Sequence, residues 1–151
     1  MSDVFTRKER SRIMRAVRSK NTRPEVAVRR LVRRLGHRCR LHVKLLPGTP
    51  DIVFPSRRKA IFVHGCYWHR HACEAGRSMP SSRVDYWRTK FDRNKRRDLK
   101  SRQALRRLGW STLVVWECQL KDAEKLESRI SKFLNNRSLR RHAATKRACR
   151  R

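Results

Sequence analysis

Residues 62–73 have the sequence Phe62-Val63-His64-Gly65-Cys66-Tyr67-Trp68-His69-Arg70-His71-Ala72-Cys73. An apolar run that begins at Ala60 ends here in a segment with three histidines, two cysteines and an adjacent tyrosine–tryptophan pair. The run predicts a buried strand, because it is short and follows a basic turn. The polar segment after it predicts a metal-organised site that acts on a planar or polyanionic molecule.

The segments around this strand predict an α/β fold. Strands are predicted where short apolar runs lie between turn residues, over residues 41–46, 51–54, 60–64 and 112–116. Helical periodicity predicts helices over residues 6–20, 22–35, 83–108 and 121–134. The long third helix has its expected inner positions at Val84, Trp87, Phe91, Leu99, Leu105 and Leu108. This order predicts a mixed central sheet flanked by helices, with a hairpin between residues 51–54 and 60–64 and a loop over residues 74–82.

The charge of the chain indicates its partner. Lysine and arginine number 42 against 12 aspartates and glutamates, which gives a formal net charge of +30 over 151 residues. Such a charge repels itself in the folded state, so we expect a polyanionic partner, with nucleic acid first. The 38% of hydrophobic residues come in ordered blocks, which argues against a disordered cationic protein. Those blocks describe a compact domain without an RNA-binding signature, so an RNA-binding protein is the weaker alternative.

The length suits one domain with two basic extensions. We expect a basic N-terminal helix that contacts DNA within residues 1–20, the domain itself over residues 21–135, and a disordered basic tail over residues 136–151. No apolar run is long enough for a membrane span, and the first residues lack the apolar segment of a secretory signal. The expected compartment is therefore the cytoplasm, where five cysteines indicate metal ligands or free thiols before disulfides.

Four residues predict a structural metal site. Three of them have the spacing Cys-x4-His-x-Cys, and the fourth follows the last predicted strand; they are Cys66, His71, Cys73 and Cys118. Three thiolates and one imidazole form a recognised tetrahedral zinc set with no vacancy for water. In the alternative interpretation, Cys66 and Cys118 are buried thiols and His71 is a surface side chain. Cys39 is predicted to be a small core residue.

A carboxylate and two histidines predict a catalytic site. Asp51 begins a strand directly after Pro50, where a carboxylate can hold Mg²⁺ against a phosphate oxygen. The paired strand brings His64 to about the same level of the sheet, and His69 follows in the next segment, where histidine is suited to accept a proton from water. The alternative for Asp51 is a turn or cap residue. Either Glu25 or Asp98 could orient a histidine, but plain surface ion pairs explain each of them equally well.

Three aromatic residues are candidates for insertion into DNA. Tyr67 and Trp68 are adjacent in a polar segment, so both are poor candidates for the core. Trp87 lies near the start of the long helix, where a core position is an equally good explanation. Side chains of this kind can wedge between base pairs and stack on them, and Met14 on the basic N-terminal helix could enter from the opposite groove.

These residues resemble the very-short-patch-repair (Vsr) T:G mismatch endonucleases of bacteria. The resemblance extends from about Ser11 to Cys118, and its specific parts are residues 46–51, 62–73, 94–98 and 108–110. It implies a fold similar to type II restriction endonucleases, with residues 21–135 as the nuclease domain. It also implies a Mg²⁺-dependent nick on the 5′ side of the mismatched thymine, within a cytosine-methylation sequence, which initiates very short patch repair of deaminated 5-methylcytosine. The implied partner is double-stranded DNA with a T:G mismatch, the implied state is a monomer, and contacts with mismatch-repair proteins are compatible with it.

The resemblance also implies residue roles. Asp51 resembles the Mg²⁺-binding carboxylate, with the backbone carbonyl of Val63 as a further ligand. His69 resembles the general base that activates water, and His64 resembles a second active-site histidine near the phosphate. The remaining matches are grouped by role: Glu25, Asn94 and Asp98 as supporting active-site residues; Cys66, His71, Cys73 and Cys118 as zinc ligands; Tyr67, Trp68 and Trp87 as the aromatic wedge; and Met14 as the residue inserted from the opposite side.

The chain departs from related nucleases in the strand at residues 60–64. Those nucleases usually have a second acidic residue and a lysine there, whereas this strand ends Ile61-Phe62-Val63-His64 with neither. Two hypotheses therefore follow. The first is a mismatch-directed DNA nicking enzyme, and the second is a non-catalytic, zinc-containing DNA-binding protein. The second explains the charge, the zinc ligands and the aromatic residues, but it gives no reason for Asp51 beside His64 and His69.

Overall fold

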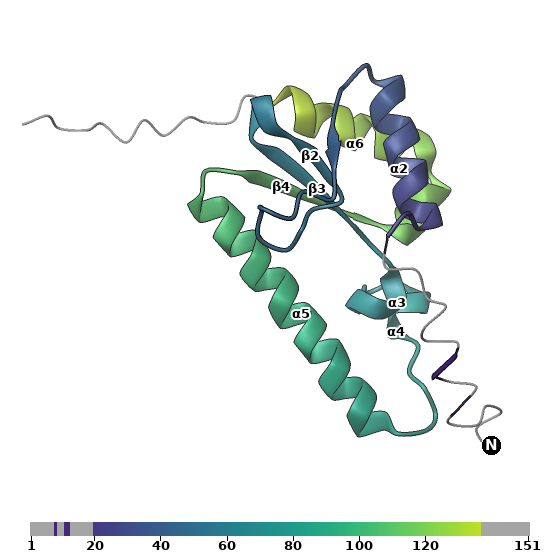
Figure 1. Cartoon of the computed structure of the whole chain (residues 1–151). Coiled ribbons are helices and arrows are strands. Elements are labelled where there is room, and N and C mark those ends of the chain that lie inside the picture. Colours follow the sequence, from purple (N-terminus) through teal and green to yellow (C-terminus); the bar gives the residue numbers. More distant parts are fainter. Residues whose placement is uncertain (1–7, 9–10, 13–19, 137–151) are drawn as a thin grey trace, which may run out of the picture.

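The computed structural model describes residues 8, 11–12 and 20–136 (Figure 1). In chain order the elements are α2 (Arg23–Arg34), β1 (Arg40–Leu41), β2 (Ile52–Phe54), β3 (Lys59–His64), α3 (Cys66–His69), α4 (Glu74–Arg77), α5 (Val84–Arg107), β4 (Ser111–Trp116) and α6 (Ala123–Asn135), with 3-10 turns at Pro55–Arg57 and Glu117–Lys121. Most of the predicted helix over residues 6–20, including Met14, and residues 137–151 of the predicted tail lie outside the described residues. None of the described helices is long and apolar enough to cross a membrane.

The four strands form one mixed sheet in the order β1-β2-β3-β4. The predicted hairpin is confirmed, because β2 and β3 pair antiparallel with Ile52 opposite Ile61 and Phe54 opposite Lys59. The turn between them passes through Arg58, which has a left-handed backbone conformation with φ +48°. β3 then pairs in parallel with β4 from Lys59–Ser111 to His64–Trp116. The carboxyl ends of these two strands therefore lie at the same edge of the sheet.

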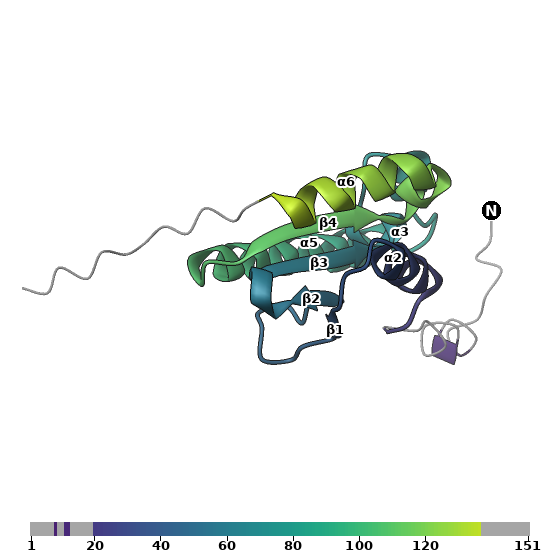
Figure 2. The same cartoon turned by 90° about the horizontal axis from the view of Figure 1, so that it is seen from above.

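Helices cover both faces of the sheet, as Figures 1 and 2 show, with α2 and α6 on one face and α5 on the other. Side chains from alternate positions of the strands meet α2 and α6 in the main core, because successive side chains of a strand point to opposite faces. The members of that core are Val28, Leu31, Val32, Ile52, Phe54, Ile61, Val115, Leu126, Ile130 and Leu134. Cys39 packs against this cluster, as the sequence predicted.

Local capping fixes the helices on the first face. Thr22 is the N-cap of α2: its Oγ1 accepts the Glu25 N–H at 3.4 Å and donates to a Glu25 carboxylate oxygen at 3.0 Å. Gly36, with φ +76°, ends this helix as predicted. Lys59 is 3% exposed, and its Nζ donates to the carbonyls of Phe133 and Leu134 at the end of α6. The ammonium thus satisfies carbonyls that the helix leaves unpaired.

The turn before β2 packs directly against α5. Gly48 has φ +75°, a conformation that side chains other than that of glycine rarely allow. A Cβ atom at Gly48 would lie 2.5 Å from the Cβ of Ser101 on α5. The turn and the helix therefore approach each other through two of the smallest residues, and this contact sets the distance between α5 and the sheet.

The predicted strand over residues 41–46 is wrong beyond Leu41. β1 ends there, His42 has φ +47°, and the Leu46 N–H bonds to the Val43 carbonyl in a turn. Leu45 is 96% exposed, so this apolar residue does not contribute to the core. The edge strand stays short because β2, its only neighbour, begins at Ile52. The predicted loop at residues 74–82 likewise contains the short helix α4.

Two expected inner positions of α5 are exposed. Trp87, Phe91 and Leu105 are buried, but Leu99 is 49% exposed and Leu108 54% exposed. At about 100° per residue, Leu99 lies about 80° from Phe91 around the helix and Leu108 about 100° in the other direction, whereas Trp87 and Leu105 lie within about 40° of it. Apolar composition alone thus overstated the width of the buried stripe.

We expect Ile61→Ala to lower the free energy of unfolding by about 2–5 kcal/mol, because Ile61 is fully buried between the sheet and two helices. Leu99→Ala, on the exposed face of α5, should change it by at most about 0.5 kcal/mol. Urea denaturation followed by circular dichroism measures both. Equal losses for the two variants would contradict this assignment of the core.

Candidate active site and metal centre

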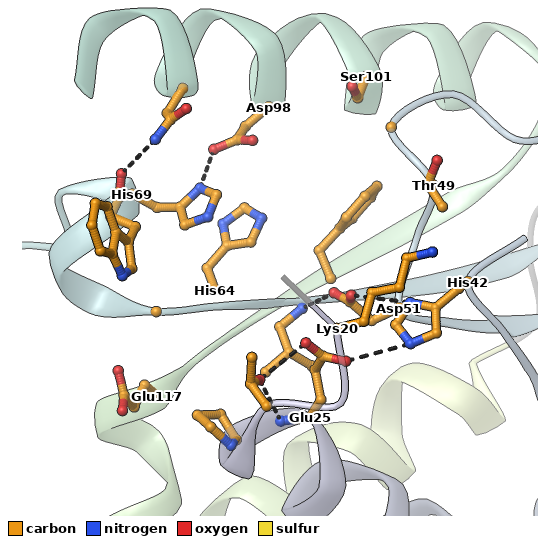
Figure 3. A pocket seen from close by; sticks show the side chains of 18 of the residues that line it. Lys20, Glu25, His42, Thr49, Asp51, His64, His69, Asp98, Ser101 and Glu117 are labelled. Carbon is orange, nitrogen blue, oxygen red and sulfur yellow. Dashed lines mark hydrogen bonds and ion pairs between the residues drawn. The ribbon is translucent and has the colours of Figure 1, made fainter. Parts of the chain in front are cut away.

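A polar pocket lies at the carboxyl end of β3, between the start of α2 and the middle of α5 (Figure 3). Its walls come from segments far apart in the sequence: the start of α2, the turns before β2, the end of β3, α3 and α5. The titratable side chains at its centre are Glu25, His42, Asp51, His64, His69 and Asp98. All of these except His42 were predicted from the sequence.

Asp51 lies directly before β2, and its carboxylate continues the pairing of the sheet. Its Oδ2 accepts the Val63 N–H at 2.7 Å, at a level where β2 offers β3 no backbone partner. Burial raises the pKa of Asp51 to about 6, and the nearby Glu25 acts in the same direction, while the Val63 N–H opposes them. The N–H and C=O of one strand residue point to the same side, so the Val63 carbonyl faces the same edge as Asp51. Two oxygen donors thus face the same side of β3, and oxygen is the donor that a hard cation prefers.

His64, His69 and Asp98 form a compact group on the α5 side of the pocket. His69 Nδ1 lies 2.5 Å from Asp98 Oδ2, and the rings of His69 and His64 stack with centroids 3.9 Å apart. Burial, followed by the charge of His69, lowers the pKa of His64 to about 4, so His64 is neutral at pH 7. Burial alone would raise the pKa of Asp98, but its hydrogen bond and charge interaction with His69 hold it below its ordinary value. An ionised Asp98 at Nδ1 leaves Nε2 of His69 as the atom that can accept a proton.

Asn94 lies one helical turn before Asp98 and supports the same segment. Its Nδ2 donates to the carbonyl of Trp68 at 3.1 Å. Two residues of α5 thus hold two consecutive residues of α3, one by its backbone and the other by its ring. The predicted supporting residues Asn94 and Asp98 are therefore both brought to the site, and neither is a plain surface side chain.

Glu25 and His42 lie on the opposite side of the pocket, beside Asp51 (Figure 3). Glu25 is 3% exposed, and its Oε2 accepts the Asn21 N–H at 2.9 Å and a proton of Arg29 Nη2 at 3.0 Å. His42 Nδ1 lies 3.8 Å from Asp51 Oδ1, and His42 Nε2 lies 3.5 Å from Glu25 Oε2. The sequence contained a signal for His42, since an antiparallel pairing of residues 41–46 with 51–54 places it opposite Asp51.

A second cluster lies behind α3 and joins the ends of β3 and β4. Its ligand atoms all lie within 4.8 Å of one another, and they belong to Cys66, His71, Cys73 and Cys118. The register of β3 and β4 places His64 opposite Trp116, so Cys66 and Cys118 each follow two residues later at the same edge. Burial raises the pKa of the Cys66 thiol to about 12, whereas the hydrogen bond with His71 lowers the pKa of Cys73 to about 6. Three thiols and one imidazole at this separation are suited to a tetrahedral metal ion.

Gly76 closes this cluster from the side of α4, and it was missed in the sequence. A Cβ at Gly76 would lie 2.0 Å from the carbonyl oxygen of His71, so only glycine permits this approach of α4 to the segment that carries His71. The signal was only a glycine inside a polar segment, which indicates a loop as readily as a close backbone contact.

The predicted wedge residues lie next to one another between α3 and α5. The rings of Trp68 and Trp87 have centroids 6.3 Å apart, and the ring of Tyr67 lies edge-on to Phe91 at 5.4 Å. Trp87 is 7% exposed, so in the protein without DNA it occupies a core position, which was one of its two interpretations from the sequence. Tyr67 and Trp68 are half-buried. The Lys90 ammonium lies 5.4 Å from the Trp68 ring centroid, which adds positive charge beside this half-buried ring.

The comparisons with known proteins agree with this geometry. Residues 2–75 match the sequence model of the family described as DNA mismatch endonuclease Vsr. The type II nicking enzyme V.XorIIP of Xanthomonas oryzae pv. oryzae is 52% identical over 135 residues, which cover 89% of this chain and 98% of that protein. DNA mismatch endonuclease Vsr of Escherichia coli is 39% identical over 126 residues, which cover 83% of this chain and 80% of that protein.

Identity at this level over nearly the whole chain, together with the pocket, defines an endonuclease. The chain belongs to the Vsr family of DNA mismatch endonucleases, which confirms the resemblance inferred from the sequence.

We expect Asp51→Asn to stabilise the magnesium-free protein at pH 7.5 by up to about 3 kcal/mol. The folded-state pKa is raised from 3.8 to about 6, so Asp51 contributes stability below pH 4 that is lost as the pH rises through 6. Asparagine avoids this loss and keeps an oxygen for the Val63 N–H. At pH 5 the gain should fall to about half, because folded Asp51 is then mostly protonated.

Urea denaturation of both proteins at pH 7.5 and pH 5 tests this expectation. The depressed pKa of His64 destabilises both proteins equally as the pH falls from 6.5 towards 4, so the difference between them isolates Asp51. Asp92→Asn, on the exposed surface of α5, is the matched control and should have no effect. An Asp51→Asn variant no more stable than wild type at pH 7.5 would refute the burial argument.

Proposed function

We propose that this protein is a Mg²⁺-dependent DNA endonuclease that nicks duplex DNA on the 5′ side of the mismatched thymine in a T:G mismatch. The mismatch would arise from deaminated 5-methylcytosine, and the nick would initiate very short patch repair. The observation that carries the proposal is the convergence of Asp51 with the His64–His69–Asp98 group in one pocket. A protein that only binds DNA has no need of a partly buried carboxylate opposite a carboxylate-oriented histidine.

Asp51 and the Val63 carbonyl are the proposed holders of Mg²⁺. When bound there, the ion supplies positive charge against the phosphate oxygens and so stabilises the charge of the transition state. Asp98, which is held ionised, fixes His69 with its proton on Nδ1, and Nε2 takes a proton from the attacking water. Attack of that water on phosphorus forms one P–O bond and breaks another, and the leaving ester oxygen takes a proton from solvent. The neutral His64 packs against His69 and offers an N–H to the phosphate, while Asn94 fixes α3.

Zinc is the proposed occupant of the cysteine cluster. Cys66, His71, Cys73 and Cys118 fit a closed structural site in the chemistry and number of their donor atoms. Because Cys66 is the first residue of α3 and His69 its last, the ion would fix the general base relative to the end of β4. It would also fix Tyr67 and Trp68, which occupy the two positions between them.

Recognition of the mismatch is proposed to use the aromatic residues. A weak base pair costs less to unstack than a matched pair, so a wedge inserted at each step measures pair strength. Trp68 is the residue best placed to enter the stack, because it is half-buried and its ring is backed by the more buried Trp87. Tyr67 would enter beside it, and Met14 is proposed for the opposite groove by resemblance alone. Surface arginines and lysines would supply the affinity for the DNA backbone.

We expect Asp51→Ala and His69→Ala to bind a T:G duplex while the rate of nicking falls at least about 100-fold, since each removes a group that acts in the transition state. The wild-type protein should nick the T:G duplex far faster than a matched T:A duplex, and only with Mg²⁺. Single-turnover nicking of end-labelled duplexes and a gel-shift assay measure the two quantities.

The matched controls are Asp92→Ala and His37→Ala. Asp92 is exposed on α5, and His37 packs edge-on to Phe54 away from the pocket. Both should nick at the wild-type rate. Full nicking by either active-site variant would refute the role assigned to that residue. A wild-type protein that binds but never nicks would favour the alternative, a non-catalytic zinc-containing DNA-binding protein.

Elemental analysis of the purified protein should give about one zinc per chain. Cys118→Ser should lose zinc and nicking together, because it removes the ligand that joins the end of β4 to α3. Cys39→Ser changes a cysteine outside the cluster and should keep the zinc. A protein that folds and nicks at full rate without zinc would overturn this part of the proposal.

A further inference from the structure

The ring of His42 lies between two carboxylates and has no role in the chemistry described above. It follows β1 in a left-handed conformation, with φ +47°, and its backbone N–H donates to the Asp51 carbonyl at 3.3 Å. Its side chain faces the same residue, with Nδ1 3.8 Å from Asp51 Oδ1. Backbone and side chain of His42 thus both approach Asp51, the proposed Mg²⁺ ligand.

Arg29 determines which nitrogen of His42 carries the proton. Its Nη2 lies 2.8 Å from His42 Nε2 and 3.0 Å from Glu25 Oε2, so each of the two Nη2 hydrogens has one partner. A guanidinium has donors only, so His42 Nε2 must accept. A neutral imidazole with an accepting Nε2 has its hydrogen on Nδ1, and that is the nitrogen that faces Asp51.

Holding Arg29 in this position costs free energy. Its Nη1 donates to the Asn21 side chain at 2.7 Å, but its Nε is buried without a hydrogen-bond partner among the described residues. A buried unpaired donor costs free energy, which the contacts with Asn21, Glu25 and His42 must offset. The guanidinium lies beside Glu25 and His42, with Nη2 in contact with both side chains. Arg29 thus supplies positive charge on this side of the pocket, where Lys20 also lines the wall.

We propose that His42, held by Arg29 with its hydrogen on Nδ1, is a positioning residue that fixes the orientation of the Asp51 carboxylate. The inference rests on the proposed function, because it takes Asp51 as the metal ligand. Val63 holds Oδ2 of this carboxylate, and the His42 N–H dipole acts on Oδ1. With an electrostatic partner for each oxygen, the carboxylate no longer turns freely, and its orientation for the metal is fixed before the metal binds.

The donor and acceptor pattern of His42 suggests a matched pair of variants. Glutamine has an oxygen that can accept from Arg29 and an NH₂ that can donate to Asp51, so His42→Gln reproduces both contacts. His42→Leu removes both with a side chain of similar bulk. Neither change alters the formal charge of the pocket, since His42 is neutral in this arrangement. A difference in metal affinity between the two variants therefore reports the orientation of the Asp51 carboxylate and not a change in the electrostatic attraction of the cation.

The experiment measures binding of Mn²⁺, a probe of the Mg²⁺ site, by the loss of its free-ion paramagnetic resonance signal in zinc-loaded, DNA-free protein. His42→Leu should raise the dissociation constant about tenfold, and His42→Gln should stay within about threefold of wild type. Wild-type affinity in His42→Leu, or equal losses in both variants, would overturn the inference. Asp51→Asn should abolish binding at the site, and unchanged binding there would refute the metal site of the proposed function itself.

A second measurement examines the wild-type protein directly and so does not depend on how the His42 variants fold. Long-range ¹⁵N–¹H correlation spectra of the wild-type protein distinguish the two neutral tautomers of each histidine. His42 should have its hydrogen on Nδ1, and in Arg29→Met this preference should be lost. A wild-type His42 that carries its hydrogen on Nε2 would overturn the inference, because Arg29 could not then be its donor.

Discussion

The parallel pairing of β3 with β4 is the interaction on which both candidate centres depend. β3 is buried on both faces, and the register carries its last residue, His64, to the level of Trp116. Because the two strands end together, the chain segments that leave them place Cys66 and Cys118 at one point, although 52 residues separate them in sequence. On the side of β2, β3 continues beyond the first residue of β2 and presents Val63 to Asp51. One strand thus positions the cysteine–histidine cluster, the two pocket histidines and the half-buried Asp51 carboxylate at the same edge of the sheet.

The electrostatics of the pocket contrast with those of the rest of the chain. The protein carries 42 basic and 12 acidic residues, yet three of the acidic ones meet at the centre of the pocket: Glu25, Asp51 and Asp98. Two of these carboxylates have pKa values shifted in opposite directions. Burial is the main cause of the raised pKa of Asp51. Burial also acts to raise the pKa of Asp98, but the hydrogen bond and charge interaction with His69 outweigh it and lower that pKa. Titratable groups whose pKa values are pushed apart by their surroundings are typical of functional sites.

Much of this arrangement could be predicted from the sequence, because local chemistry determines it. Thr22 and Gly36 mark the ends of one helix, and the spacing of residues 51–64 allows a hairpin. The features that escaped prediction depend on three-dimensional context. Leu45 is apolar but exposed, because the edge strand has too short a neighbour to continue. The sequence predicts His42 as an ordinary strand residue; strand pairing accounts for its position opposite Asp51, but its contact with Glu25 depends on how α2 packs. The width of the buried stripe on α5 depends on how much of the helix circumference its neighbours cover, which residue types alone do not reveal.

The close contact between Gly48 and Ser101 limits which sequences this fold can accept. The turn at Gly48 lies against α5 with no space for a single added methyl group, and Asp98 lies one turn away from Ser101 on the same helix. A larger residue at either position would push α5 outwards and carry Asp98 and Asn94 away from α3. Surface arginines can be exchanged one at a time without such an effect. Gly48 is restricted both by this contact and by its left-handed backbone, with φ +75°. We therefore expect a glycine at position 48 and a small residue at position 101 to persist during divergence while the charge around them drifts.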